Sequence, residues 1–241
     1  MFLTRYAALA WAALAVTLSP VLAQTAPDAN PPETDIRPAA PQSSSLPPAA
    51  ASEILDGPRQ GDRWTYELKD NVTDEVKATI TNTVVDVTDK EIVTRASFRG
   101  QSNQQTVIFD HNWNRVDDMV WKWTPNDGLG IKTPLAVGKE WRHESTSSNM
   151  TNGTILRTAV DAKVVGKESV TTKAGTFDVF KVVYTVRQTN THDSTKSSNS
   201  TVDLLYAPLV NHWVKRRAVV RVEGRLRDDT TLELVDYSRK P

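Results

Sequence analysis

Alternation of apolar and polar residues with a period of two is the feature that most restricts how this chain folds. Trp64, Tyr66 and Leu68 alternate with polar neighbours, and similar alternation recurs at 76–80 and 119–123. Such alternation is typical of strands with one face in water. Gly-, Asn- and Asp-containing turns separate the runs, and no stretch sustains a helical period with caps. We therefore predict an all-β fold, a large, curved or partly closed antiparallel sheet of about a dozen strands with few or no helices.

Composition and pattern divide the chain into three predicted segments. Residues 1–23 combine a basic start, an apolar Ala/Leu run and small residues before Gln24, the pattern of a cleaved secretory signal peptide; an uncleaved membrane anchor is the alternative. Residues 24–53 carry seven prolines and no aromatic residue, which predicts a disordered linker. Residues 54–241 form the predicted globular domain. We expect an exported protein, periplasmic or secreted, with no transmembrane anchor after cleavage.

A weak internal repeat is present within the predicted domain. Residues 61–67 and 138–144 share the pattern G-x-x-W-x-[YH]-E at an offset of 77. True duplication would give two similar β-units, 61–130 and 138–237, with a crevice between them as the natural ligand position. Chance similarity between two β-rich segments is the alternative interpretation.

The chemical inventory argues against catalysis. The chain has no cysteine and equal numbers of basic and acidic residues, 29 each, which excludes Cys-ligated metals, thiolate chemistry and a field that favours nucleic acid. The four histidines lack metal-ligand spacing, and no nucleophile elbow, phosphate loop or dinucleotide fingerprint is present. We predict no catalytic residue, no metal and no cofactor. A hydrolase site assembled from distant parts of the fold remains one alternative.

Bulky aromatic residues are concentrated in two regions and form the predicted ligand-binding set. Alternation is expected to place Met119 on the same face as its neighbouring tryptophans. Core packing, the lining of an apolar pocket and an exposed stacking platform are the three open interpretations. The predicted ligand-binding residues are Trp113, Met119, Trp121, Trp123, Tyr206 and Trp213.

A cationic strand follows the second aromatic region. Lys215, Arg217 and Arg221 are the predicted surface contacts, with Arg225 and Arg227 just beyond them. One interpretation is contact with anionic lipid headgroups or acidic glycans. The other interpretation is a solvent-exposed strand whose charges prevent edge-to-edge pairing with other chains.

Four short motifs resemble bacterial exported proteins of unknown function, including those called TapB-like. The main one is Lys173–Val182, and the others are the segments 61–66, 134–141 and 205–215. The resemblance covers roughly residues 60–238. Leu209 and Asn211 stand where that family usually has glycines, so the turn there is expected to differ. By distant analogy the resemblance implies a curved antiparallel sheet like that of periplasmic lipoprotein carriers, whose concave face holds acyl chains.

Three functions from different classes follow from these observations. The first is a non-catalytic exported envelope protein that binds a lipid or other apolar or amphipathic ligand on a concave β-sheet. The second is a structural or assembly partner of another envelope protein, acting through strand edges and the linker. The third is a hydrolase with an unrecognised site.

Overall fold

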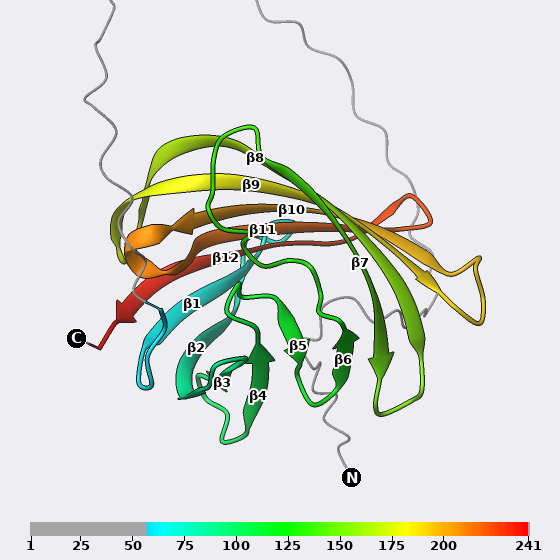
Figure 1. Cartoon of the computed structure of the whole chain (residues 1–241), viewed down its shortest axis with the longest axis horizontal. Coiled ribbons are helices and arrows are strands. Elements are labelled where there is room, and N and C mark those ends of the chain that lie inside the picture. Colours follow the sequence, from blue (N-terminus) through cyan, green and yellow to red (C-terminus); the bar gives the residue numbers. More distant parts are fainter. Residues whose placement is uncertain (1–56, 241) are drawn as a thin grey trace, which may run out of the picture. The chain divides into compact units, whose positions relative to one another are not determined.

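The computed structural model describes residues 57–240, so the predicted signal peptide (1–23) and the predicted linker (24–53) lie outside the described residues. The described chain folds into twelve antiparallel strands that close into a barrel, with one short 3₁₀ helix, η1 (Pro208–Val210) (Figure 1). This confirms the predicted all-β class and the predicted strand number.

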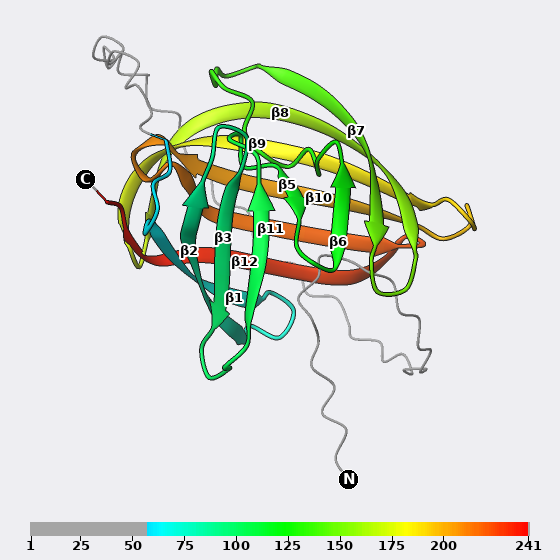
Figure 2. The ribbon, with the colours of Figure 1, turned by 60° about the horizontal axis from the view of Figure 1, so that its bottom comes forward.

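Each strand pairs with its neighbours in sequence, and β12 pairs with β1 to close the ring. The long strands form an arch, and the short strands of the first half run across it (Figure 2). The strands are β1 (Arg63–Asp70), β2 (Val76–Val87), β3 (Ile92–Phe98), β4 (Gln104–Phe109), β5 (Arg115–Asp117), β6 (Trp121–Thr124), β7 (Glu140–Asn149), β8 (Ile155–Thr172), β9 (Gly175–Asn190), β10 (Ser197–Ala207), β11 (His212–Val222) and β12 (Arg225–Ser238).

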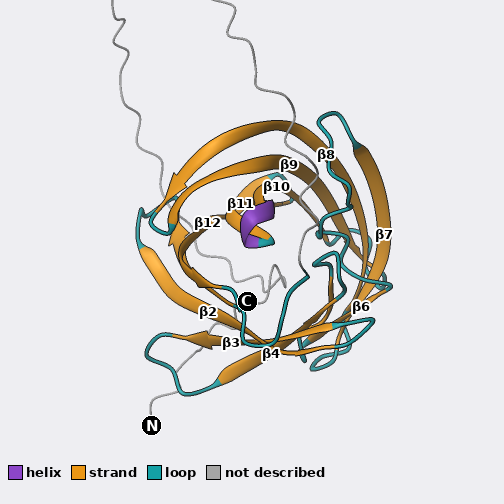
Figure 3. Cartoon of the chain, turned by 60° about the vertical axis from the view of Figure 1, so that its left-hand side comes forward, coloured by secondary structure: helices purple, strands orange, loops and turns teal. Residues whose placement is uncertain are grey.

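Because successive strands reverse direction, the barrel has two distinct ends. The turns that follow the odd-numbered strands, from β1–β2 to β11–β12, lie at one end, which we call the hairpin end. The other end holds η1 and is called the η1 end. Figure 3 shows η1 within the ring of strands, where Val210 is fully buried. The η1 end is therefore filled by the chain itself.

The two copies of the repeated motif adopt the same local structure. Gly61 and Gly138 both have a positive φ, 90° and 88°, which a glycine adopts without strain. Each donates its N–H to a buried valine carbonyl, Val84 or Val164, at 2.8 Å, and the valine N–H bonds back to the residue after the glycine. Both valines are also followed by a register shift in their strands. The motif thus specifies one strand entry used twice, at β1 and at β7.

Two turns differ from a simple strand pattern. Met119 is not on a strand beside Trp121, as the alternation predicted, but in the β5–β6 turn with φ 69°. The Asp118 side chain accepts the N–H groups of residues 120 and 121 and so closes the turn. In the turn after β10, Asn211 takes the left-handed conformation, φ 51°, while Leu209 lies inside η1 and avoids it.

Candidate functional site

The predicted aromatic set divides according to burial. Trp113, Trp121, Trp123 and Tyr206 are buried, with at most 8% of each side chain exposed. Trp213 is partly exposed, and Met119 is 55% exposed at the hairpin end. The structure therefore separates Met119 from the tryptophans with which it was grouped.

A compact aromatic cluster at the η1 end is centred on His212. Its ring stacks on the Trp64 ring, with 4.7 Å between the centroids, and lies edge-to-face against the Trp113 ring, with 4.6 Å between the centroids. The Tyr66 hydroxyl bonds His212 Nδ1 and donates to the carbonyl of Trp213. Burial lowers the pKa of His212 to about 3, so the ring is neutral and acts as a core side chain.

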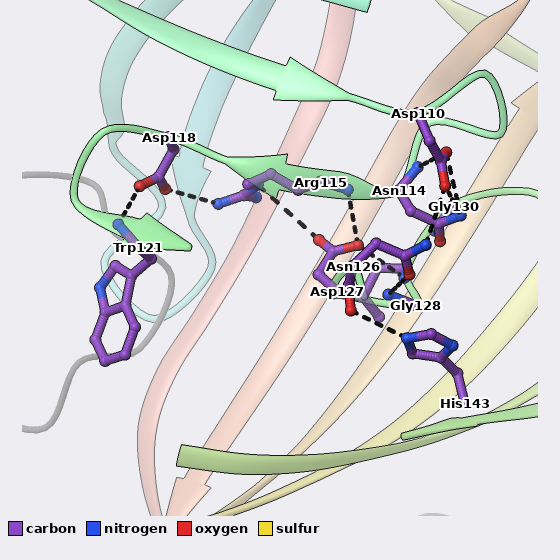
Figure 4. Close-up of polar contacts among 11 residues, drawn as sticks. Asp110, Asn114, Arg115, Asp118, Trp121, Asn126, Asp127, Gly128, Gly130 and His143 are labelled. Atoms are coloured by element: carbon purple, nitrogen blue, oxygen red, sulfur yellow. Dashed lines mark hydrogen bonds and ion pairs between the residues drawn. The ribbon is translucent and has the colours of Figure 1, made fainter. Parts of the chain in front are cut away.

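A buried polar network lies on the inner side of β5 (Figure 4). Arg115 lies between two carboxylates, with Nη1 3.2 Å from Asp118 Oδ2 and Nε 3.9 Å from Asp127 Oδ2. Asp127 also accepts the backbone N–H of Arg115 at 2.9 Å. Burial raises the pKa of Asp127, and the positive charges of Arg115 and Arg216 act in the opposite direction. Burial also lowers the pKa of Arg216 to about 9. The guanidinium of Arg115 lies 5.0 Å from the ring of Trp123, so the network also positions that indole.

The same network holds the segment after β6 against the strands. His143 Nε2 donates to the carbonyl of Asn126 at 3.0 Å, and the Tyr184 hydroxyl donates to the carbonyl of Gly130 at 2.9 Å. Gly128 has φ 71°, and a Cβ there would collide with the His143 ring. Hydrogen bonds from β7 and β9 therefore hold residues 126–130 in place. Holding this segment is a structural role, and it explains the network.

Three inward-facing apolar side chains near the hairpin end are partly exposed. Along β3 the inward-facing Ile92, Thr94 and Ala96 are buried, while Phe98 is partly exposed. Ile80, its cross-strand neighbour on β2, and Leu232 on β12 are likewise partly exposed, although they share a face with buried core residues. We call Ile80, Phe98 and Leu232 the apolar inner wall. These three inward-facing apolar side chains are therefore partly accessible to solvent.

The opposite side of the interior is polar. Trp121 Nε1, Ser145 Oγ and Ser147 Oγ are buried and have no hydrogen-bond partner among the described residues. They lie on the adjacent strands β6 and β7, where Trp123 pairs with Ser147. We call Trp121, Ser145 and Ser147 the polar inner wall. Burying a hydroxyl or indole N–H without a hydrogen-bond partner destabilises a fold by about 1–3 kcal/mol, so a polar ligand atom that bonded these groups would remove that cost.

Replacing Ser147 with alanine is expected to raise the free energy of unfolding of the free protein by about 1 kcal/mol. The reason is that Ser147 is 1% exposed and its hydroxyl is desolvated without compensation. Urea denaturation measures the change, and Ser148→Ala on the partly exposed neighbour is the control. A clear loss of stability in Ser147→Ala would mean that the hydroxyl has a partner in the free protein.

The predicted cationic contacts are mostly neutralised. Lys215 Nζ lies 2.8 Å from Glu233, and Arg217 makes two hydrogen bonds to Asp229. Arg221, at the end of β11, is exposed and forms no ion pair with any described residue. Of the three, Arg221 is thus the one outside an ion pair, although its charge adds to the hydrogen bond from Arg217 in lowering the pKa of Asp229.

A groove of about 540 Å³ lies along β7, β8 and β9. It is lined by Glu140, Trp141, Arg142, Asp161, Ala162, Lys163, Val165, Val183 and Thr185. Its charges are paired: Arg142 bonds Asp161 at 2.7 Å, and Lys163 bonds Glu140 at 2.7 Å. The pKa of Asp161 is lowered chiefly by its hydrogen bond from Arg142. This groove was not among the sites predicted from the sequence, although Glu140 and Trp141 lie within the second copy of the repeated motif.

Ser145 and Ser147 were also missed, because an all-polar stretch of β7 carries no apolar period that would indicate an inner face. His143 lies on the same inward row as Ser145, yet its Nε2 bonds the Asn126 carbonyl. Residues 57–240 contain no group of three or more His, Asp or Glu side chains arranged to hold a metal ion.

In the described part of the chain, no helix has the length and apolar character needed to cross a bilayer.

Comparison with known proteins yields a partial family match and two fold relatives. A family model described as DUF3108-like matches residues 132–207, which include β7 to β10 and every residue of the groove. No curated protein matches the chain. The resemblance to TapB-like proteins stays a prediction.

The solved structures that resemble this chain are bacterial. A candidate lipoprotein from Parabacteroides distasonis has a TM-score of 0.53 at 14% identity and covers 76% of this chain and 98% of its own. A candidate exported protein with a YmcC-like fold from Bacteroides fragilis has a TM-score of 0.51 at 14% identity, covering 77% and 99%. The hypothetical lipoprotein YmcC from Escherichia coli is more distant, with a TM-score of 0.44. At these identities the chain shares with the first two a fold.

Proposed function

We propose that this chain is an exported, non-catalytic protein of the bacterial envelope that binds an amphipathic ligand inside the hairpin end of the barrel. The observation that carries the proposal is the polar inner wall, three buried polar groups without partners that face the interior. The export part draws support from the descriptions of the fold relatives as a lipoprotein and an exported protein.

The chemistry of the two walls defines the ligand class. Trp121 Nε1 donates, and the hydroxyls of Ser145 and Ser147 donate or accept, so they suit an uncharged oxygen such as a hydroxyl or ester carbonyl. The apolar inner wall offers Ile80, Phe98 and Leu232 to an alkyl chain. A glycerol monoester or a comparable neutral amphiphile combines both features.

Fluorescence titration with monodecanoylglycerol, kept below its aggregation concentration, tests the proposal, because Trp121, one of the seven tryptophans of the chain, lies in the polar inner wall. We expect Ser147→Ala to weaken binding about fivefold through the loss of one hydrogen bond. Leu232→Ser is expected to weaken it by at least as much through lost apolar contact. Val183→Ser, in the groove, is the control and is expected to leave the affinity unchanged.

The combination of results is diagnostic. If the free protein gains stability in Ser147→Ala while ligand affinity falls, the hydroxyl serves the ligand rather than the fold. Absence of wild-type binding would overturn the proposal. Loss of binding in Val183→Ser, with Ser147→Ala unchanged, would move the site to the groove.

A further inference from the structure

Exposed apolar side chains gather at the hairpin end of the barrel. Among the residues described, eight large hydrophobic side chains are markedly exposed, and five of them lie at this end: Val72, Val76, Met119, Met150 and Leu226. Met150 donates its N–H to the carbonyl of Val120 at 2.8 Å, so the β5–β6 and β7–β8 turns, which carry Met119 and Met150, are adjacent. These residues come from four separate parts of the rim.

Three arginines surround Leu226 on the β11–β12 hairpin. Arg221 is its cross-strand partner, and Arg225 and Arg227 flank it in sequence. All three are exposed, and none forms an ion pair with a described residue. Glu223 and Asp228 are also in this hairpin, so residues 221–228 contain three cationic and two anionic side chains.

We propose that the hairpin end docks onto a bilayer that contains anionic phospholipid, with the β11–β12 hairpin as the principal contact. Leu226 enters the interfacial layer, and the arginines around it bind phosphate oxygens, for which the guanidinium fork is suited. Met119 and Met150 add apolar contact on another part of the rim. The inference goes beyond ligand binding and does not require it.

The distribution of the exposed residues favours a membrane over a protein partner. A protein interface buries one contiguous patch with an apolar centre. Here the apolar side chains stand on separate turns around one end of a barrel, next to cations. A fluid surface accommodates such dispersed contacts, and each cation near an anionic leaflet adds about 1 kcal/mol of attraction.

Co-sedimentation of the mature chain, without the predicted signal peptide 1–23, with vesicles tests the proposal. Vesicles of phosphatidylethanolamine with phosphatidylglycerol are expected to bind the protein, and vesicles of phosphatidylethanolamine with phosphatidylcholine are expected to bind it weakly. Arg225→Ser/Arg227→Ser is expected to lower the partition coefficient about 30-fold, equivalent to the loss of about 2 kcal/mol. Lys90→Ser/Lys132→Ser, two exposed lysines at the η1 end, removes the same charge and is expected to change it little.

The apolar contribution is tested separately. Leu226→Ser is expected to weaken anionic-vesicle binding several-fold, while Val137→Ser, 57% exposed at the other end, leaves it unchanged. Equal loss in the arginine and lysine double variants, or no binding of the wild type to anionic vesicles, would overturn the proposal. Titration of Arg225→Ser/Arg227→Ser with monodecanoylglycerol keeps this outcome separate from that of the proposed function, because the inner walls are unaltered.

Discussion

Replacing Trp64 with alanine is expected to lower the free energy of unfolding by about 3–5 kcal/mol, a large fraction of the stability of a domain. Trp64 is fully buried, donates its Nε1 hydrogen to the carbonyl of Val210 at 3.2 Å and packs against His212 and Trp113. Alanine would remove the contacts that join β1 to the η1 turn and would leave a cavity. Urea denaturation followed by circular dichroism measures the loss.

Trp141 provides a matched comparison, because it occupies the same position in the second copy of the repeated motif. Trp141 is partly exposed, and its ring packs edge-to-face against Tyr184 with 6.0 Å between the ring centroids. We expect Trp141→Ala to cost clearly less than Trp64→Ala. An equal loss would mean that the two positions contribute alike despite their different burial. Where Trp64→Ala does not fold, Trp64→Phe provides the milder measurement.

Acidification is expected to destabilise the fold through His212. Its pKa is about 3 in the folded protein, against 6.5 for an ordinary histidine, because burial disfavours the charged ring. Below pH 6.5 the unfolded state binds a proton that the folded state does not, so stability falls as the pH is lowered from 6.5 toward 3. The slope is about 1.4 kcal/mol per pH unit, which accumulates to about 4–5 kcal/mol.

The pH dependence of unfolding in His212→Gln isolates this contribution. The variant loses stability at neutral pH, since packing on Trp64 is altered, but its stability declines less steeply on acidification than that of the wild type. His192→Gln, an exposed histidine in the β9–β10 turn, is expected to keep the wild-type slope. A wild-type slope that persists in His212→Gln would show that His212 is not the group responsible.

The fold class was predictable from local pattern because period-two alternation acts within each strand. The buried Trp64, Tyr66 and Leu68 on one face of β1 follow it directly. The position of Met119 did not follow, because the carboxylate of Asp118 closes a turn where the alternation suggested a continuous strand. Side-chain hydrogen bonds of this kind override an apolar pattern.

The candidate site was less predictable because it depends on contacts between distant segments. The segment at 126–130 is held by Asp127 against Arg115 and by Tyr184 from β9, and neither pairing leaves a trace in the local sequence. Ser145 and Ser147 face the interior because β7 pairs with β6 and β8, whereas their residue types suggested solvent. Likewise, the charges of Lys215 and Arg217 are cancelled by β12, and this depends on register.

Ring closure has a consequence for how this chain reaches its folded state. Eleven of the twelve ladders join strands that are consecutive in sequence, and they form from local hairpins. The pairing of β1 with β12 instead brings together residues as far apart as Arg63 and Ser238. Closing so long a loop costs conformational entropy, and the β1–β12 pairing, which we call the seam, has to offset that cost. Non-local pairing of this kind slows folding. The Trp64 and His212 cluster bridges β1 and β11 across that seam, so the same contacts that fill the core also hold the two ends of the meander together.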